Sequence, residues 1–301
     1  MEKLTNLIMI EAYRPSSFDD LIFAEKNKIL EYLKEPKAIP SFIFYSSSPG
    51  SGKTSCAKLI INTLGCDSIV INSSKDRGID IIRNDISLFS RGLSFNKNIK
   101  KCVFMDESDG MLKAAQDSLR NLIEEYSDNV FFIFTANDLS KIIEPIRSRC
   151  VLFNFNKPDK KEILTKLINI CELENINFNE NECLDILNLY YPDIRSMVMC
   201  LQDKKLGGGI EKKLLIFDEA LIQLKAKNFD YFKEHIYSQE LDLLRFNSYL
   251  FKYFFNNYKV YGLDKIGKIL LLLADNEKAM NIGVTAEIVV TANLIQIMQI
   301  L

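Results

Sequence analysis

The stretch Ser46-Ser47-Ser48-Pro49-Gly50-Ser51-Gly52-Lys53-Thr54-Ser55 decides the fold that this sequence predicts. It follows a short apolar run at 42–45 and leads into an amphipathic run at 56–61. A strand, a glycine-containing loop and a helix start in this order are typical of a phosphate-binding loop. The glycines allow backbone N–H groups to turn toward an anion, and the helix N-terminus adds partial positive charge. The stretch therefore predicts a site for a nucleoside triphosphate.

Two side chains of this stretch have the chemistry that such a site needs. Lys53 is placed to reach the β- and γ-phosphates, and the hydroxyl of Thr54 is placed to hold Mg²⁺. One position departs from the usual pattern, because Ser47 stands where a phosphate-binding loop normally begins with glycine. The alternative, a Gly/Ser turn before a helix, explains less of the surrounding strand and helix pattern.

The bulk composition excludes several classes of protein. The 301 residues suffice for two or three domains, and a formal net charge of −2 gives no global reason to expect nucleic-acid binding. Any such binding must therefore use a local basic strip. Seven scattered cysteines without a C-x-x-C pair, together with a single histidine, disfavour zinc and indicate reduced thiols. The apolar runs are too short to span a bilayer, so we expect a soluble cytoplasmic protein without a membrane partner.

Short apolar runs alternate with helical stretches between residues 42 and 155. This alternation predicts an α/β domain with a parallel sheet that is covered on both faces. From residue 158 onward only helical periodicity is present, and three consecutive glycines at 207–209 indicate a linker. The segment before residue 41 has no core pattern of its own, and we expect it to lie across the nucleotide domain. The candidate strands are Phe42–Tyr45, Ser68–Asn72, Lys101–Met105, Asn129–Thr135 and Cys150–Phe155, and the candidate helices between them are Thr54–Leu64, Gly78–Ser90, Leu112–Ser127 and Ile142–Ser148.

Two acids end the third candidate strand. Asp106 is placed to hold Mg²⁺ through water, and Glu107 is placed to polarise the water that attacks the γ-phosphate. A strand that ends in a solvated acidic turn is the alternative, and the presence of Lys53 and Thr54 in the same chain makes it less favoured.

Three polar residues farther along the chain have two interpretations each. Asn137, after the fourth candidate strand, fits either a water-orienting role or the cap of the next helix. Arg149 fits either an arginine finger that acts on a neighbour's γ-phosphate or a solvated surface residue. Arg195 either folds back on the nucleotide or pairs with Asp193.

Taken together, six motifs in this order make the sequence resemble the AAA+ clamp-loader ATPases. That family includes the replication factor C small subunits and the phage clamp-loader large subunit, and Ser47 and the compact chain favour the phage branch. The resemblance covers residues 10 to 200, and the later helices only by position. The motifs are Tyr13-Arg14-Pro15, Gly50-Ser51-Gly52-Lys53-Thr54, Asp106-Glu107-Ser108-Asp109, Thr135-Ala136-Asn137, Ser148-Arg149-Cys150 and Pro192-Asp193-Ile194-Arg195.

The resemblance implies a three-part architecture and a role for each matching residue. An AAA+ nucleotide-binding domain is expected at 1–156, a helical lid domain at 157–207, and a helical collar or oligomerisation domain at 208–301. For the nucleotide, it implies an adenine pocket from Tyr13, Arg14 and Ile22, phosphate contacts from Gly50, Ser51, Gly52, Lys53, Thr54 and Ser55, and Mg²⁺ contacts from Thr54 and Asp106. For the reaction, it implies Glu107 as catalytic base, Asn137 and Arg195 as first and second sensors, and Arg149 acting in trans.

The resemblance further implies ATP and Mg²⁺ as cofactors, and a homo- or hetero-oligomeric ring or spiral with a further subunit as the active form. Its partners would be a sliding clamp and primer–template DNA, with the host cytoplasm as location if the source is a phage. Lys75, Arg77 and Arg83 are the expected contacts to the DNA backbone, and a solvated helix face is their alternative. Two other functions remain open: another AAA+ DNA-acting ATPase, such as a helicase loader or branch-migration motor, or a nucleotide-binding structural subunit without turnover.

Overall fold

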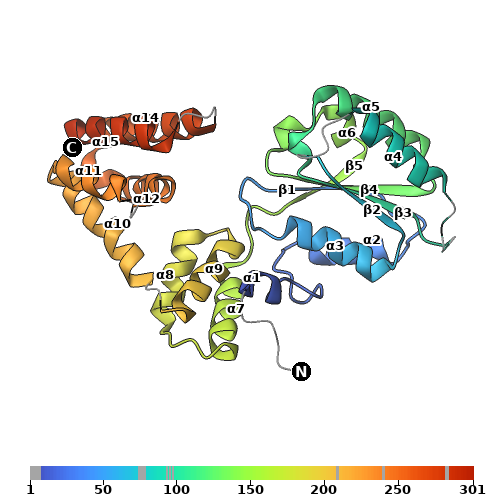
Figure 1. Cartoon of the computed structure of the whole chain (residues 1–301), viewed down its shortest axis with the longest axis horizontal. Helices are drawn as coiled ribbons and strands as arrows, with labels where there is room; N and C mark the ends of the chain where they lie inside the picture. The colour runs from blue at the N-terminus through green and yellow to red at the C-terminus, as the bar shows by residue number, and fades with distance from the viewer. Residues whose placement is uncertain are drawn as a thin grey trace. The chain divides into compact units, whose positions relative to one another are not determined.

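The protein is described by a computed structural model over residues 8–73, 79–92, 94, 96, 98–207, 210–238, 241–281 and 285–301. It divides into two compact units, Met1–Gly207 and Gly208–Leu301. The first unit contains a parallel sheet and the second is built from helices (Figure 1). This confirms the predicted fold class.

The sheet has five parallel strands in the order β2-β3-β4-β1-β5. Its central strands are nearly all apolar because helices cover both faces, and a strand buried on two sides loses the alternating pattern. Every residue of β4 is buried, as are the first four of β1. The strands are β1 (Ser41–Tyr45), β2 (Ser68–Asn72), β3 (Lys101–Asp106), β4 (Val130–Ala136) and β5 (Cys150–Asn154), each within one or two residues of its predicted bounds.

Two helical layers enclose this sheet, as Figure 1 shows. On one face, α2 (Lys26–Leu33) and α3 (Lys53–Leu64) cover a cluster of phenylalanines that includes Phe42, Phe44 and Phe131. On the other face, α4 (Ile79–Arg91), α5 (Lys113–Glu125) and α6 (Glu144–Arg147) pack over Phe132 and Phe134. Successive residues of β4 thus point to opposite faces. The two turns η1 (Ser108–Gly110) and η2 (Leu139–Lys141) follow β3 and β4.

The segment before β1 lies against the nucleotide domain, as expected, and several of its side chains belong to the core of that domain. After the short helix α1 (Met9–Ala12), the buried side chains of Phe18, Leu21 and Phe23 join the phenylalanine cluster. The ring of Phe23 stacks on Phe155, with 3.9 Å between the ring centroids. The irregular spacing of these residues in a turn-rich segment hides their burial from a periodicity argument.

Three helices complete the first unit, and they begin at well-formed caps. The carboxylate of Asp159 accepts hydrogen bonds from backbone N–H groups at the start of α7 (Lys160–Leu173). Asn179 and Glu182 form a capping box at the start of α8 (Glu180–Tyr190), and Asp193 caps α9 (Ile194–Lys205). Such caps satisfy backbone donors that a helix leaves unpaired.

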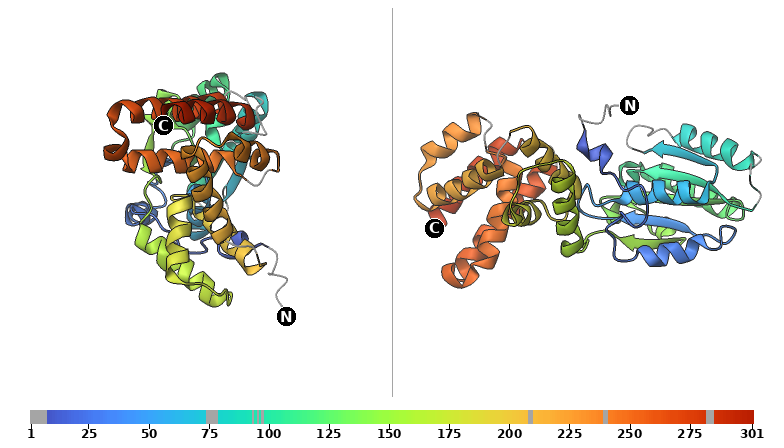
Figure 2. Two further views of the ribbon diagram at one scale, coloured as in Figure 1. Left: turned by 90° about the vertical axis from the view of Figure 1, so that its left-hand side faces the viewer. Right: turned by 90° about the horizontal axis from the view of Figure 1, so that it is seen from below.

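In the described part of the second unit, helices are joined by short turns (Figure 2). Its core includes Phe232, Phe246 and Phe254, which are fully buried. Across the described ranges of both units, every helix is too short or too polar to cross a lipid bilayer. The helices are α10 (Ile210–Lys225), α11 (Phe229–Tyr237), α12 (Leu243–Asn256), α13 (Tyr258–Tyr261), α14 (Leu263–Asn281) and α15 (Ala286–Ile300).

Candidate nucleotide-binding site

A pocket lies where the strands β1, β3 and β4 end, at the carboxyl edge of the sheet. Ligands of open parallel sheets bind at this edge, because the loops that follow neighbouring strands converge there. The pocket brings together residues that are far apart in the sequence and that the motifs had assigned to the nucleotide. These are Tyr13, Arg14, Ile22, Gly50, Ser51, Gly52, Lys53, Thr54, Ser55, Asp106, Glu107, Asn137 and Arg195.

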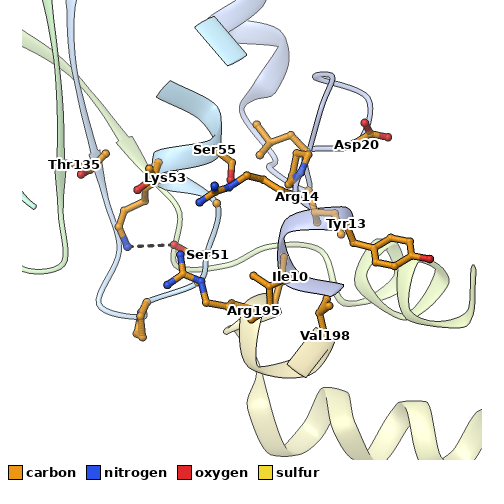
Figure 3. Close-up of a pocket in the computed structure, with 18 of the residues that line it drawn as sticks. Ile10, Tyr13, Arg14, Asp20, Ser51, Lys53, Ser55, Thr135, Arg195 and Val198 are labelled. Carbon is orange, nitrogen blue, oxygen red and sulfur yellow. Dashed lines mark hydrogen bonds between the residues drawn. The ribbon is translucent and has the colours of Figure 1, made fainter. Parts of the chain in front are cut away.

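Lys53 is held inside the phosphate loop rather than extended into solvent. Its Nζ donates to the carbonyl of Ser48 at 3.0 Å and to the hydroxyl of Ser51 at 3.3 Å (Figure 3). Only 8% of the residue is exposed. Burial lowers the pKa of Lys53 to about 8, and the nearby carboxylates of Asp109 and Asp106 partly oppose that shift. The loop thus encloses a cation that a bound anion would stabilise in its charged form.

Two glycines of the loop have positive φ, which side chains disfavour. Gly50 has φ +68° and Gly52 has φ +97°. A Cβ atom added at Gly50 would lie 1.9 Å from Oδ1 of Asp193, so Asp193, at the start of α9, packs directly on the loop backbone. Glycine is required at position 50 for both reasons.

Ser47, the departure from the usual pattern, has a structural partner. Its backbone N–H and its hydroxyl both donate to Oδ1 of Asn156, at 2.7 and 2.9 Å. The serine therefore connects the start of the loop to the chain that leaves β5.

Hydrogen bonds among side-chain oxygens and one backbone N–H connect Thr54 of the loop with the ends of β3 and β4. The hydroxyls of Thr54 and Thr135 donate to the same oxygen of Asp106, at 3.0 and 2.5 Å. The Thr135 hydroxyl also accepts from the backbone N–H of Glu107 at 3.0 Å. Glu107 itself adopts a left-handed conformation with φ +55° and is exposed at the pocket. Thr135 thereby holds the carboxylate of Asp106 and the backbone of Glu107.

The donor set at Thr54 and Asp106 fits Mg²⁺. Magnesium prefers oxygen ligands, commonly one or two carboxylates completed by water and phosphate oxygens. One hydroxyl and one carboxylate, 3.0 Å apart, meet that description. Among the described residues no cluster of three or more His, Cys, Asp or Glu side chains could hold a metal by itself. The metal would thus need phosphate oxygens as further ligands.

Three predicted residues approach the pocket from outside the sheet. Arg195 extends from the first turn of α9 toward Ser51, as Figure 3 shows. Arg14 also lines the pocket, where its guanidinium donates to Glu11 at 2.7 Å. Tyr13 directs its ring away from the loop, and its hydroxyl donates to Glu174 at 2.6 Å. Burial and this carboxylate raise the pKa of Tyr13 well above its usual value.

Arg149 does not line this pocket. It lies between α6 and β5, where its guanidinium forms an ion pair with Glu124 and donates to the carbonyl of Pro145 at 2.6 Å. Its hydrogen bonds in this arrangement are thus to Glu124, Pro145 and Ser148, which also do not line the pocket. Of the expected DNA contacts, Lys75 and Arg77 lie outside the described residues, and Arg83 is part of α4.

Comparisons with known proteins show the family of this chain. The model of the family "ATPase family associated with various cellular activities (AAA)" matches residues 43–157. The replication factor C small subunit 2 of Pyrobaculum islandicum is 34% identical over 218 residues, which are 70% of this chain and 67% of that protein. The chain belongs to the AAA+ ATPases related to replication factor C small subunits. The resemblance stated from the motifs is therefore confirmed.

This AAA+ chain spans a slightly smaller share of two other relatives. The replication factor C small subunits of Sulfurisphaera tokodaii and Saccharolobus solfataricus are each 34% identical, and the chain spans 64% of the length of each. Among solved structures, the RuvB Holliday junction branch migration motor of Thermotoga maritima has a TM-score of 0.56. That match covers 91% of this chain and 87% of RuvB at 18% identity, so it shows the shared fold alone.

The structure adds pocket residues to which the motifs had assigned no role. Asp20, Leu21, Thr135, Lys166 and Val198 line the pocket beside the predicted set. Lys166, from α7, donates to the backbone carbonyl of Asp20 at 3.0 Å. Of these five, only Thr135 occurs in a quoted motif, where its position at the end of an apolar strand indicated a place at this edge.

Proposed function

We propose that this AAA+ protein is an ATPase subunit of a sliding-clamp loader, which opens a clamp and places it on primer–template DNA during replication. The observation that carries the proposal is the joining of Thr54, Asp106 and Thr135 in one hydrogen-bonded group beside Lys53. The relationship to replication factor C small subunits supports the cellular role.

In the proposed reaction each residue of the pocket has one task. Lys53 binds the β- and γ-phosphates, and Thr54 and Asp106 hold Mg²⁺. When bound, Mg²⁺ neutralises charge on the phosphate oxygens. Glu107 accepts the proton of the attacking water, since its backbone is fixed by Thr135 while its side chain faces the pocket. Asn137 orients that water from the end of β4.

The remaining pocket residues select and sense the nucleotide. Ile22, Tyr13 and Arg14 form the adenine side of the pocket, while residues 50–55 wrap the phosphates with backbone N–H groups. Arg195 carries positive charge from the lid toward the loop, and a triphosphate attracts it more strongly than a diphosphate does.

Assembly completes the site. Because Arg149 does not line its own pocket, we assign it to the γ-phosphate bound by the adjacent subunit, where a guanidinium stabilises developing charge. Hydrolysis then requires a ring or spiral of copies of this chain or of this chain with a further subunit. ATP, clamp and DNA favour the same arrangement, so each raises the affinity for the others.

The proposal includes the division into nucleotide-binding (1–156), lid (157–207) and collar (208–301) domains, with the collar joining neighbouring subunits. Contacts of Lys75, Arg77 and Arg83 with the DNA backbone, and the cytoplasmic location, also belong to it. The relationship to the phage branch that Ser47 suggested has no support in the relatives named above, all of which are proteins of cellular organisms.

The decisive experiment measures ATP hydrolysis by the purified complex with and without primed DNA and its cognate clamp. We expect both ligands together to stimulate turnover. Strand displacement without any clamp requirement would indicate another DNA-acting AAA+ motor instead. ATP binding without turnover under every condition would indicate a structural subunit and would overturn the proposal.

A further inference from the structure

The guanidinium of Arg149 is held on two sides by its own subunit. Along one edge, Oε1 of Glu124 accepts from Nε at 2.7 Å and also from Nη2. At the opposite corner, Nη1 donates to the carbonyl of Pro145 at 2.6 Å and to the hydroxyl of Ser148 at 3.3 Å. Glu124 belongs to the last turn of α5, whereas the carbonyl lies in α6. Two separate elements therefore fix the plane of one guanidinium.

This plane remains open toward solvent. The side chains of Arg149 and Glu124 are 33% and 54% exposed. A guanidinium has five N–H donors in a rigid fork, and the four contacts leave donor capacity at Nη2. The arrangement presents a cation outward in a defined direction.

We propose that Glu124 is a positioning residue that orients Arg149 for the γ-phosphate bound by the neighbouring subunit. The inference rests on the proposed function, in which Arg149 completes the neighbouring subunit's nucleotide site, and it adds Glu124 as a residue that supports this arginine. Exposed ion pairs contribute little to folding stability, so the value of this pair lies in its geometry. A long side chain that is already ordered loses less conformational entropy when the phosphate arrives.

The first test compares three variants in the assembled complex. Glu124→Ala is expected to lower kcat about 3- to 10-fold, a range set by the entropy of ordering one long side chain, with the KM for ATP and assembly unchanged. Glu124→Gln keeps an oxygen that accepts the same hydrogen bonds and should stay within about twofold of wild type. Glu125→Ala, which removes the exposed acid next along α5, is the matched control and should leave the rate unchanged.

A double variant separates positioning from a general effect on the structure. If Glu124 acts through Arg149, Glu124→Ala causes no further loss in the Arg149→Ala background, measured on the residual turnover. A further loss there, a Glu124→Ala complex as fast as wild type, or a Glu124→Gln complex as slow as Glu124→Ala would each overturn the proposal.

A second measurement does not need turnover. Phenylglyoxal modifies free guanidinium groups, and peptide mass spectrometry of the full chain follows Arg149 alone. We expect Glu124→Ala to raise the modification rate of Arg149 at least about threefold, since the ion pair that shields it is removed. An unchanged rate would show that Glu124 does not hold the arginine. A wild-type complex without ATP turnover would instead refute the proposed function, and the modification assay would still decide the role of Glu124.

Discussion

Replacing Gly50 with alanine tests the contact between the phosphate loop and the lid. The new Cβ would lie 1.9 Å from Oδ1 and 2.9 Å from Cγ of Asp193, and 2.9 Å from Cβ of Arg195. Real Cβ atoms essentially never come this close, so the loop or the start of α9 must shift. The positive φ of +68° adds backbone strain of its own.

The expected cost has two parts. A non-glycine residue in the left-handed region costs about 1–2 kcal/mol. Overpacking a tight contact costs about 1–3 kcal/mol more. Gly65→Ala is the matched control, because Gly65 has φ +57° but no atom within 4 Å of the added Cβ. The difference between the Gly50 and Gly65 variants therefore isolates the lid contact.

The assay is urea denaturation followed by circular dichroism, in the transition that includes Met1–Gly207, together with binding of a fluorescent ATP analogue. We expect Gly50→Ala to cost at least about 1 kcal/mol more than Gly65→Ala, which is about a fivefold difference in the folding equilibrium. Gly50→Ala should also weaken ATP binding by a similar factor, whereas Gly65→Ala should not.

A second substitution identifies the clashing side chain. Asp193→Ser shortens the side chain but keeps an oxygen that caps α9, so it should restore part of the stability lost in Gly50→Ala. Equal costs at Gly50 and Gly65 would refute the reasoning, as would strictly additive effects of the Gly50 and Asp193 substitutions.

Five further outcomes follow from the pocket and from Arg149. ATP affinity should be constant below pH 8 and fall about tenfold per pH unit above it, measured by titration, because the buried Lys53 with a pKa of about 8 loses the proton that the phosphates need. The same depressed pKa means that the unfolded chain holds more protons between pH 8 and 10.5, so the stability contribution of Lys53 should rise across that window. Thr135→Val should cost about 1–3 kcal/mol of stability, because Asp106 loses a hydrogen-bond donor and the backbone N–H of Glu107 loses its acceptor. If this variant hydrolysed ATP at the wild-type rate, Thr135 would have no role in the site. Glu107→Gln should bind ATP normally but hydrolyse it about 100-fold more slowly or worse, and faster release of DNA by this variant would contradict its role as base. Arg149→Ala should likewise spare ATP binding and reduce turnover of the assembled complex to a small residual rate; a normal rate would exclude the arginine from the reaction.

The sheet could be predicted from the sequence because its strands are buried on both faces. Such strands read as short, continuous apolar runs, and Val130–Ala136 is the clearest case. The nucleotide pocket followed from the same reasoning, since polar residues that end neighbouring parallel strands meet at one edge. Thr54 and Asp106 could therefore be placed together although 52 residues separate them in the sequence.

Other contacts carry no local pattern and could not be predicted. Phe18 and Phe23 enter the core from a segment without regular periodicity, where only the tertiary structure decides which side chains are buried. The partnership of Thr135 with Asp106 spans 29 residues, and that of Arg149 with Glu124 spans 25. Both arise from strand order and helix placement, which a single sequence does not specify.

The contact between α9 and the phosphate loop gives a physical reason for a lid that responds to the nucleotide. Asp193, the N-cap of α9, packs on Gly50, and Arg195 in the first turn of that helix approaches Ser51. A triphosphate at this loop attracts the arginine and repels the aspartate, so the preferred position of α9 depends on the balance between two opposite charges. Hydrolysis and loss of the γ-phosphate remove negative charge from the pocket and change that balance. The proposed sensor Arg195 and the residue that requires glycine in the loop thus belong to one electrostatic arrangement.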